Sequence, residues 1–109
     1  MFGLKFSETV NNWIVSSLEY IKDVLEAPIA AENHYKELKE TYKKLKENPY
    51  RRPLVRNKFL ASKGIRIITV KNYMLIYTID ENNKTVFLYR FMYGKRDWIN
   101  ILTNELKEE

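Results

Sequence analysis

Apolar residues in the first quarter of this 109-residue chain change from an alternating to a helical spacing. Residues 2–6 alternate between large apolar side chains and small or charged ones, which predicts a short strand. Ser7 suits the N-cap of a helix that follows this strand. The spacings of three and four residues put one apolar stripe on that helix, with Trp13 expected in the core. The stripe comprises Val10, Trp13, Ile14, Leu18, Ile21 and Leu25.

A second amphipathic helix is expected to begin at Pro28, a residue suited to a first helical turn. It is expected to end at Asn48-Pro49, because the residue before a proline avoids helical backbone angles. Its apolar stripe comprises Ala31, Tyr35, Leu38, Tyr42 and Leu45. The short connection between the two helices predicts an antiparallel helical hairpin.

The second half of the chain is rich in β-branched and aromatic residues, which predicts strands. They are expected over residues 65–71, 73–80 and 85–93. Lys71-Asn72 is expected to form a tight turn, because Asn tolerates a positive φ. Both connections between the strands are short, so we expect an antiparallel meander. Residues 96–106 predict a closing helix, and residues 49–63, which follow no period, predict an irregular connector.

Both faces of the predicted meander carry apolar side chains. Pairing Val70 with Tyr73 and Asp80 with Thr85 puts Arg66, Leu75, Arg90 and Met92 on one face, and Met74, Ile76, Phe91 and Tyr93 on the other. A sheet with one wet face would alternate between apolar and polar residues, so both faces are expected to be covered. The hairpin can cover one face. The other must be covered by the last helix, a second chain or a bound partner.

The composition predicts a single α+β domain over residues 1–109 without a metal site or cofactor. The chain has no cysteine and one histidine, His34, which argues against a disulfide, a thiolate zinc site or a histidine-built metal site. We expect His34 on the polar side of its helix. The N-terminus is unlike a signal peptide, and no apolar run is long enough for a membrane span. These features predict a soluble cytoplasmic protein.

Positive charge is concentrated in one block of the sequence. The net charge of the chain is +5, but residues 51–96 carry 11 Lys and Arg against 2 Asp and Glu. Such a field attracts nucleic acid, an anionic membrane or an acidic protein, although a generally basic surface is the alternative. We expect these cations to gather at one rim of the sheet. The candidates for target or nucleic-acid binding are Arg51, Arg52, Arg56, Lys58, Arg66, Arg90, Lys95 and Arg96. Arg66 and Arg90 could instead form structural ion pairs, for instance with Asp80 or Glu105.

Three segments carry a family resemblance: GIR at residues 64–66, KNYMLIYTIDENNKTV at 71–86 and RFMYGKRDW at 90–98. Together with the predicted order of strand, helical hairpin, basic connector, meander and last helix, they resemble the RelE/ParE superfamily of toxins from bacterial type II toxin–antitoxin modules, which include plasmid stabilisation systems. The resemblance spans nearly the whole chain. It implies a toxin that a small antitoxin protein holds silent, with either a homodimer or a toxin–antitoxin hetero-oligomer as the assembly.

The resemblance implies two alternative activities. RelE-like members cut messenger RNA on the ribosome, and ParE-like members inhibit DNA gyrase without cutting RNA. RelE-like members place an arginine where this chain has Met74, a tyrosine where it has Leu102, or a His-Tyr pair where it has Met92-Tyr93. Arg96 matches a further arginine of the ribonucleases, so Arg96 and Tyr93 are the candidate catalytic residues if the protein is a ribonuclease. The Arg-Asp-Trp at residues 96–98 looks closer to ParE-like sequences.

The leading hypothesis is therefore a growth-arresting toxin with a cognate antitoxin as partner and gyrase as target. An endoribonuclease acting on ribosome-bound messenger RNA is the second hypothesis. A nucleic-acid-binding module without toxicity is the third, although residues 51–96 contain no known RNA- or DNA-reading motif. We expect the antitoxin to dock on the uncovered sheet face and the basic connector. No membrane partner is expected.

Overall fold

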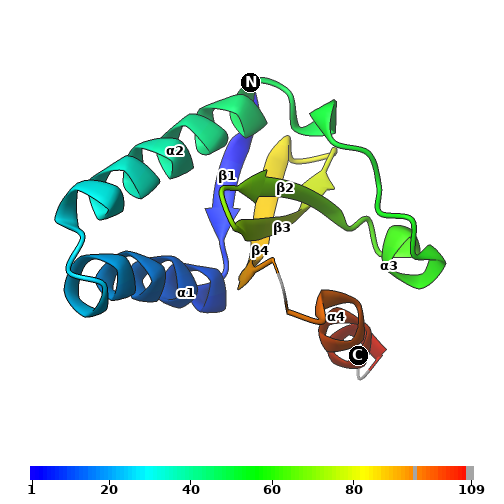
Figure 1. Cartoon of the computed structure of the whole chain (residues 1–109). Helices are drawn as coiled ribbons and strands as arrows, with labels where there is room; N and C mark the ends of the chain where they lie inside the picture. The colour runs from blue at the N-terminus through cyan, green and yellow to red at the C-terminus, as the bar shows by residue number, and fades with distance from the viewer. Residues whose placement is uncertain (95, 108–109) are drawn as a thin grey trace.

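A four-stranded sheet lies between two layers of helices (Figure 1). The structure, a computed structural model, describes residues 1–94 and 96–107. The elements are β1 (Gly3–Phe6), α1 (Glu8–Glu19), the π-helix η1 (Tyr20–Val24), α2 (Pro28–Glu47), the 3-10 turn η2 (Pro49–Arg51), α3 (Lys58–Ser62), β2 (Arg66–Val70), β3 (Tyr73–Asp80), β4 (Thr85–Tyr93) and α4 (Trp98–Lys107). This order confirms the predicted α+β class. None of the described helices is long and apolar enough to cross a membrane.

The sheet has the strand order β1-β4-β3-β2. β2, β3 and β4 form the predicted antiparallel meander, with Val70 opposite Tyr73 and Asp80 opposite Thr85 as expected. β1 pairs with β4 in parallel, which adds the N-terminal strand to the sheet edge. The tight turn differs in one respect, because the positive φ of 53° belongs to Lys71 and not to Asn72.

β4 contains a bulge that reverses the faces of its last residues. Ile76 pairs with Arg90, but the next residue of β3, Tyr77, pairs with Leu88, so β4 has one extra residue between these pairs. An extra residue shifts the alternation of side chains by one position. Phe91 therefore packs with the hairpin, and Met92 packs under α4. The expectation that Arg90 and Met92 lie on the same face as Leu75 was wrong for this reason.

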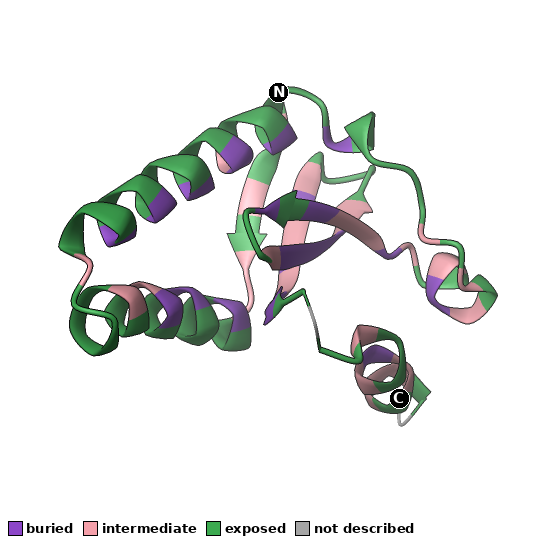
Figure 2. Ribbon diagram, in the orientation of Figure 1, coloured by how far each residue is buried: buried purple, intermediate pink, exposed green. Residues whose placement is uncertain are grey.

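The helical hairpin covers one face of the sheet, and its buried residues lie on the side of each helix that faces the sheet (Figure 2). Ser7 caps α1 as predicted, since its Oγ accepts a hydrogen bond of 2.9 Å from the Val10 amide. The buried side of α2 comprises Ala31, His34, Leu38, Thr41 and Leu45. The prediction of a buried Tyr35 was wrong, as was that of a buried Trp13, because the sheet contacts the neighbouring edge of each apolar stripe.

α3 and α4 cover the other face of the sheet. Of the three possible covers that the sequence allowed for this face, the structure shows the last helix. Buried side chains from both helices and the sheet form this second cluster: Leu60, Ile65, Met74, Ile76, Met92 and Leu102. Glu105 of α4 forms an ion pair with Arg90 and accepts a hydrogen bond of 2.7 Å from the Tyr89 hydroxyl. Arg90 is thus a structural ion-pair partner, and the expectation of a free sheet face for a partner was wrong.

The burial of Leu102 predicts how strongly α4 depends on this core. Leu102 is 0% exposed, whereas Ile99 on the same helix is 38% exposed. We expect Leu102→Ala to lower the free energy of unfolding by about 3 kcal/mol, because a buried leucine leaves a cavity. The matched change Ile99→Ala should cost below about 1 kcal/mol. Urea denaturation of both variants tests this, and equal losses would contradict the packing of α4 described above.

Candidate functional site

The end of β4 forms a corner against α1 and the β2–β3 turn. The Gly94 amide donates a hydrogen bond of 2.7 Å to the Asn72 carbonyl, and a Cβ at Gly94 would lie 3.0 Å from that oxygen. Such a close backbone approach favours glycine. The Arg96 amide then donates to the Tyr93 carbonyl at 3.0 Å, which turns the chain toward α4. The corner therefore holds Tyr93 and Arg96 beside the hairpin.

Two adjoining hollows at this corner make up what we call the strand-exit cleft. One, of about 300 Å³, is lined by Trp13, Ser16, Ser17, Tyr20, Tyr73, Tyr93 and Arg96. The other, of about 530 Å³, is lined by Tyr20, Ile21, Leu25, Ala30, His34, Lys71, Asn72, Tyr73 and Tyr93. Tyr20, Tyr73 and Tyr93 line both. The π-helix η1 contributes Tyr20 and Ile21 to the wall of the cleft. Single π-helical turns are frequent at functional sites.

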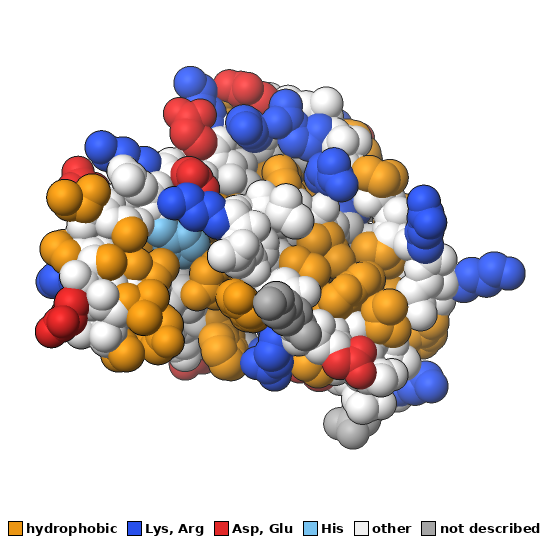
Figure 3. Space-filling model, viewed as in Figure 1, with side chains coloured by type: hydrophobic (Ala, Val, Ile, Leu, Met, Phe, Trp, Pro, Cys, Tyr) orange, Lys and Arg blue, Asp and Glu red, His pale blue; other side chains and the backbone are white. Residues whose placement is uncertain are grey.

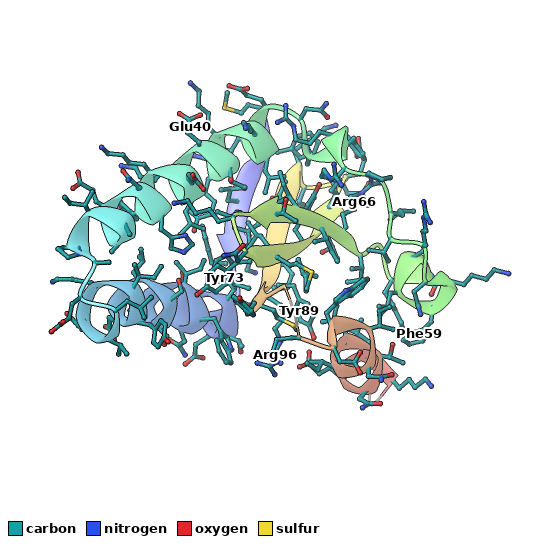
Figure 4. All side chains as sticks on the ribbon, in the orientation of Figure 1. Glu40, Phe59, Arg66, Tyr73, Tyr89 and Arg96 are labelled. Atoms are coloured by element: carbon teal, nitrogen blue, oxygen red, sulfur yellow. The ribbon has the colours of Figure 1, made fainter. Side chains whose placement is uncertain are left out.

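Arg96 and Tyr93 are the predicted site residues that the structure places in this cleft. The Arg96 guanidinium carbon lies 5.9 Å from the centroid of the Trp13 ring, a cation–π distance. Tyr93 is 43% exposed, and its ring meets that of Tyr73 edge to face at 5.7 Å. Figure 4 shows Tyr73 and Arg96 at the same end of the sheet, on the side near α1.

His34 lies on the wall of the cleft and is buried, so the expectation of a solvent-exposed His34 was wrong. It is 1% exposed, and its ring centroid lies 5.2 Å from that of Tyr73. Ser17 Oγ lies 3.3 Å from His34 Nε2 and donates its own proton to the Ile14 carbonyl at 2.7 Å. The serine oxygen therefore accepts from Nε2, which fits a neutral imidazole protonated there. A small part of the one histidine is visible in pale blue in Figure 3.

The electrostatics of the cleft favour neutral side chains. Burial lowers the pKa of His34 below its usual value, and the nearby charge of Lys71 lowers it further. Burial also raises the pKa of Tyr73, with smaller contributions from Tyr93 and Tyr20. Lys71 itself lies 3.8 Å from a Glu37 oxygen. A neutral, aromatic cleft with the Arg96 guanidinium at its edge is suited to binding a partner through apolar contacts and a carboxylate or phosphate.

The positions at which ribonuclease relatives carry catalytic groups belong to the second core in this chain. Met74, Met92 and Leu102 are buried under α3 and α4. None of these side chains transfers protons. Met74 lines a small hollow with Tyr73 and Tyr93, whereas Met92 and Leu102 line no hollow of the strand-exit cleft. General acid–base chemistry at the cleft would therefore fall to Tyr93 and His34.

A second group of cations lies along the outer strand β2, around a hollow of about 340 Å³. We call this the basic hollow, and it is lined by Thr41, Lys44, Arg51, Arg52, Ile68 and Thr69. Arg66 lies beside it, because its Nη1 donates to the Arg52 carbonyl at 2.6 Å. Burial raises the pKa of Tyr77, whereas the positive charges of Arg66, Arg52 and Arg51 act to lower it. Three guanidinium groups thus converge near one buried phenol.

The other predicted cations do not join either group. Arg56 and Lys58 are exposed on and beside α3, Arg90 lies under α4, and Lys95 lies outside the described residues. Arg66 lies opposite Tyr77 of β3, and Arg96 follows Tyr93, which lies opposite Tyr73. Tyr73 and Tyr77 are four residues apart, or about 13 Å along β3. Figure 4 shows Arg66 and Arg96 at different ends of the sheet. The expectation that the cations gather at one rim was therefore wrong.

Sequence reasoning missed several residues of both sites. Trp13 and Tyr20 of the cleft come from α1 and η1. Trp13 lies on the predicted apolar stripe and Tyr20 does not, and no sequence signal indicated that both are exposed at a cleft. Lys44 of the basic hollow is different, because a signal was available. It lies one turn before the Asn48-Pro49 helix end, which brings it next to Arg51 when the chain turns back.

Comparisons with known proteins agree with this architecture. A chain of the solved structure described as the chromosomal ParDE TA system from P. aeruginosa has the same fold, with a TM-score of 0.66. It is 17% identical in sequence, and the match covers 87% of this chain and 98% of that one. No curated protein matches the sequence. The family model of the ParE toxin of type II toxin–antitoxin systems matches residues 4–98. The chain therefore belongs to the ParE toxin family, within the RelE/ParE superfamily that its motifs resemble.

The buried His34 predicts a pH dependence of stability. Because its pKa is lowered in the folded state, the unfolded chain binds more protons below the ordinary histidine pKa of about 6.5. We expect the free energy of unfolding to fall as the pH drops from about 7.5 to 5, by at most about 1.4 kcal/mol per pH unit. This window lies above the titration range of most carboxylates.

The matched control for this prediction is His34→Gln, which keeps a hydrogen-bond donor but does not titrate. Urea denaturation of both proteins at several pH values measures the difference. The variant should lose most of the decline between pH 7.5 and 5. A decline of the same size in both proteins would contradict the assignment to His34.

Proposed function

We propose that this ParE-family toxin arrests growth by binding DNA gyrase through the strand-exit cleft, without cleaving RNA. The observation that carries the proposal is the burial of Met74, Met92 and Leu102, at the positions where ribonuclease relatives have charged or titrating groups. Binding a protein target requires a complementary shape, apolar surface and a few polar contacts. Trp13 and Tyr93 supply apolar surface, and Arg96 supplies a polar contact. The protein acts in the cytoplasm, where gyrase and DNA are present.

Cleavage of ribosome-bound messenger RNA is the second candidate function, and one observation favours it. His34, Tyr93 and Arg96 line one cleft, so a base, a phenol and a cation are present together. Against this, Nε2 of His34 is engaged by Ser17, and burial keeps the imidazole out of solvent. The binding function therefore has the stronger support.

We further propose that a cognate antitoxin neutralises the toxin by covering the hairpin tip. The tip is the connection between α1 and α2, and it exposes Tyr20, Val24, Leu25 and Ile29. Figure 3 shows orange side chains spread over this side of the molecule. Exposed apolar patches of this kind mark interaction sites. Tyr20 and Leu25 also line the cleft, so an antitoxin on the tip would block it and form a toxin–antitoxin hetero-oligomer.

The mode of action is tested by inducing the protein in bacteria without its antitoxin. We expect growth arrest with a DNA-damage response, and primer extension should find cellular messages intact. Arg96→Ala should relieve the arrest, because it removes the cation at the cleft. Arg56→Ala, an equal loss of charge on the exposed connector, should not. New message cuts that vanish in Arg96→Ala would contradict the gyrase proposal and favour the ribonuclease.

The antitoxin surface is tested by placing a charge on the tip. Val24 and Ile29 are 66% and 74% exposed, so Val24→Glu and Ile29→Glu should leave the fold intact. We expect both variants to resist rescue by the cognate antitoxin, sought in the adjacent reading frame, while the wild-type protein is rescued. Val15→Glu, the same change on the exposed side of α1, is the control. Full rescue of both tip variants would remove the hairpin tip as the antitoxin surface.

A further inference from the structure

The basic hollow shares no lining residue with the strand-exit cleft, although its Thr69 also lines a small hollow with Tyr73 and Tyr93 of the cleft. It has no role in the proposed action on gyrase. It is formed where the C-terminal half of α2, the connector after η2 and the outer strand β2 meet. Its cations are Lys44, Arg51 and Arg52, and Thr69 adds a hydroxyl from β2. Figure 3 shows Lys and Arg side chains gathered over the upper part of the molecule, above the sheet.

Arg52 of this hollow and its neighbour Arg66 are held in place by contacts with backbone carbonyls. Arg52 Nε donates to the Ile67 carbonyl at 3.3 Å, and Arg66 fixes the Arg52 carbonyl from the other side. The Arg66 guanidinium carbon also lies 5.3 Å from the centroid of the Tyr50 ring. A guanidinium that is already oriented loses less conformational entropy when it binds an anion. The hollow is therefore partly preorganised for binding an anion.

The positive charge of the hollow is not neutralised by acidic side chains. The ion pairs found among residues 1–94 and 96–107 involve Lys36, Lys71, Lys84 and Arg90, and none involves Lys44, Arg51 or Arg52. Like charges held close together repel one another and raise the local potential. An anion that enters the hollow relieves this repulsion, and a phosphate can accept both N–H groups of an arginine fork.

We propose that the basic hollow binds the phosphate groups of single-stranded nucleic acid. An acidic peptide would gain most by extending the sheet at β2, but that edge is already in use at residues 65–67. Leu54 forms a bridge with Arg66, the Val55 amide donates to the Ile65 carbonyl at 3.1 Å, and Arg52 occupies the Ile67 carbonyl. A phosphate backbone needs no strand edge.

An exposed aromatic ring beside the hollow supports a nucleic-acid ligand. Tyr50 is exposed and lies in η2, directly before Arg51. Bases of single strands stack on such rings while neighbouring cations hold the phosphates. The inference does not depend on the proposed action on gyrase, because it concerns other residues and another ligand.

The test is fluorescence anisotropy of a labelled oligothymidylate of about 12 nucleotides with the full-length protein, at salt concentrations from about 50 to 250 mM. The double variant Lys44→Gln, Arg51→Gln should bind at least about tenfold more weakly, and its slope of log affinity against log salt should fall by about 1.4, or about 0.7 per lost phosphate contact. The control Arg56→Gln, Lys58→Gln loses the same charge outside the hollow, and its affinity should change by less than about threefold.

A second variant guards against an indirect effect on folding. Thr69→Glu introduces a negative charge at an exposed position of the hollow, and it should weaken binding to a similar extent while thermal melting stays unchanged. Equal losses in the two double variants would overturn the proposal, as would the absence of binding at low salt. Displacement of the oligonucleotide by polyglutamate as effectively as by unlabelled oligothymidylate would also overturn it, because the site would then select carboxylates or charge alone.

Discussion

The bulge in β4 decides which helical layer each of the last residues of that strand contacts. Without the extra residue between the pairs Ile76–Arg90 and Tyr77–Leu88, Arg90 would face the hairpin and Phe91 would face α4. With it, Phe91 stacks on Tyr73 at a centroid distance of 4.7 Å and supports the buried His34. Arg90 meets Glu105 and ties α4 to the sheet. Both the cleft and the closure of the second core depend on this shift of one residue.

Because α3 and α4 cover the second core, the sheet face beneath them is not accessible to a partner. α3 and α4 fill that face, so a partner meets the hairpin tip, the strand-exit cleft or the basic hollow. The three surfaces differ in chemistry, because the tip is apolar, the cleft is aromatic with one guanidinium at its edge, and the hollow is cationic. The tip and the cleft share Tyr20 and Leu25, so a partner on one of these two surfaces also reaches the other. The difference in chemistry among the three surfaces explains why charge counted along the sequence did not predict where charge gathers in space.

The sequence predicted the strands and turns well, but it predicted poorly which side of each strand or helix is buried. β3 and β4 begin and end as predicted, because polar turn residues bound two long β-branched and aromatic runs. The bulge left no sequence signal, since residues on either side of Tyr89 are large on both faces. In α2, the stripe through Tyr35 is the more apolar of two neighbouring stripes, yet the structure buries the one through His34. The choice between them depends on Ser17, which a different helix brings to the imidazole. Contacts between distant segments thus determined what local patterns could not.

We propose that the strand-exit cleft binds a protein target and carries out no RNA chemistry. A DNA supercoiling assay with purified protein and purified gyrase, run in parallel with an assay on ribosomes that hold a defined message, tests this proposal. We expect supercoiling to fall as toxin is added while the message stays full length. A cleaved message with unchanged supercoiling would refute the proposal.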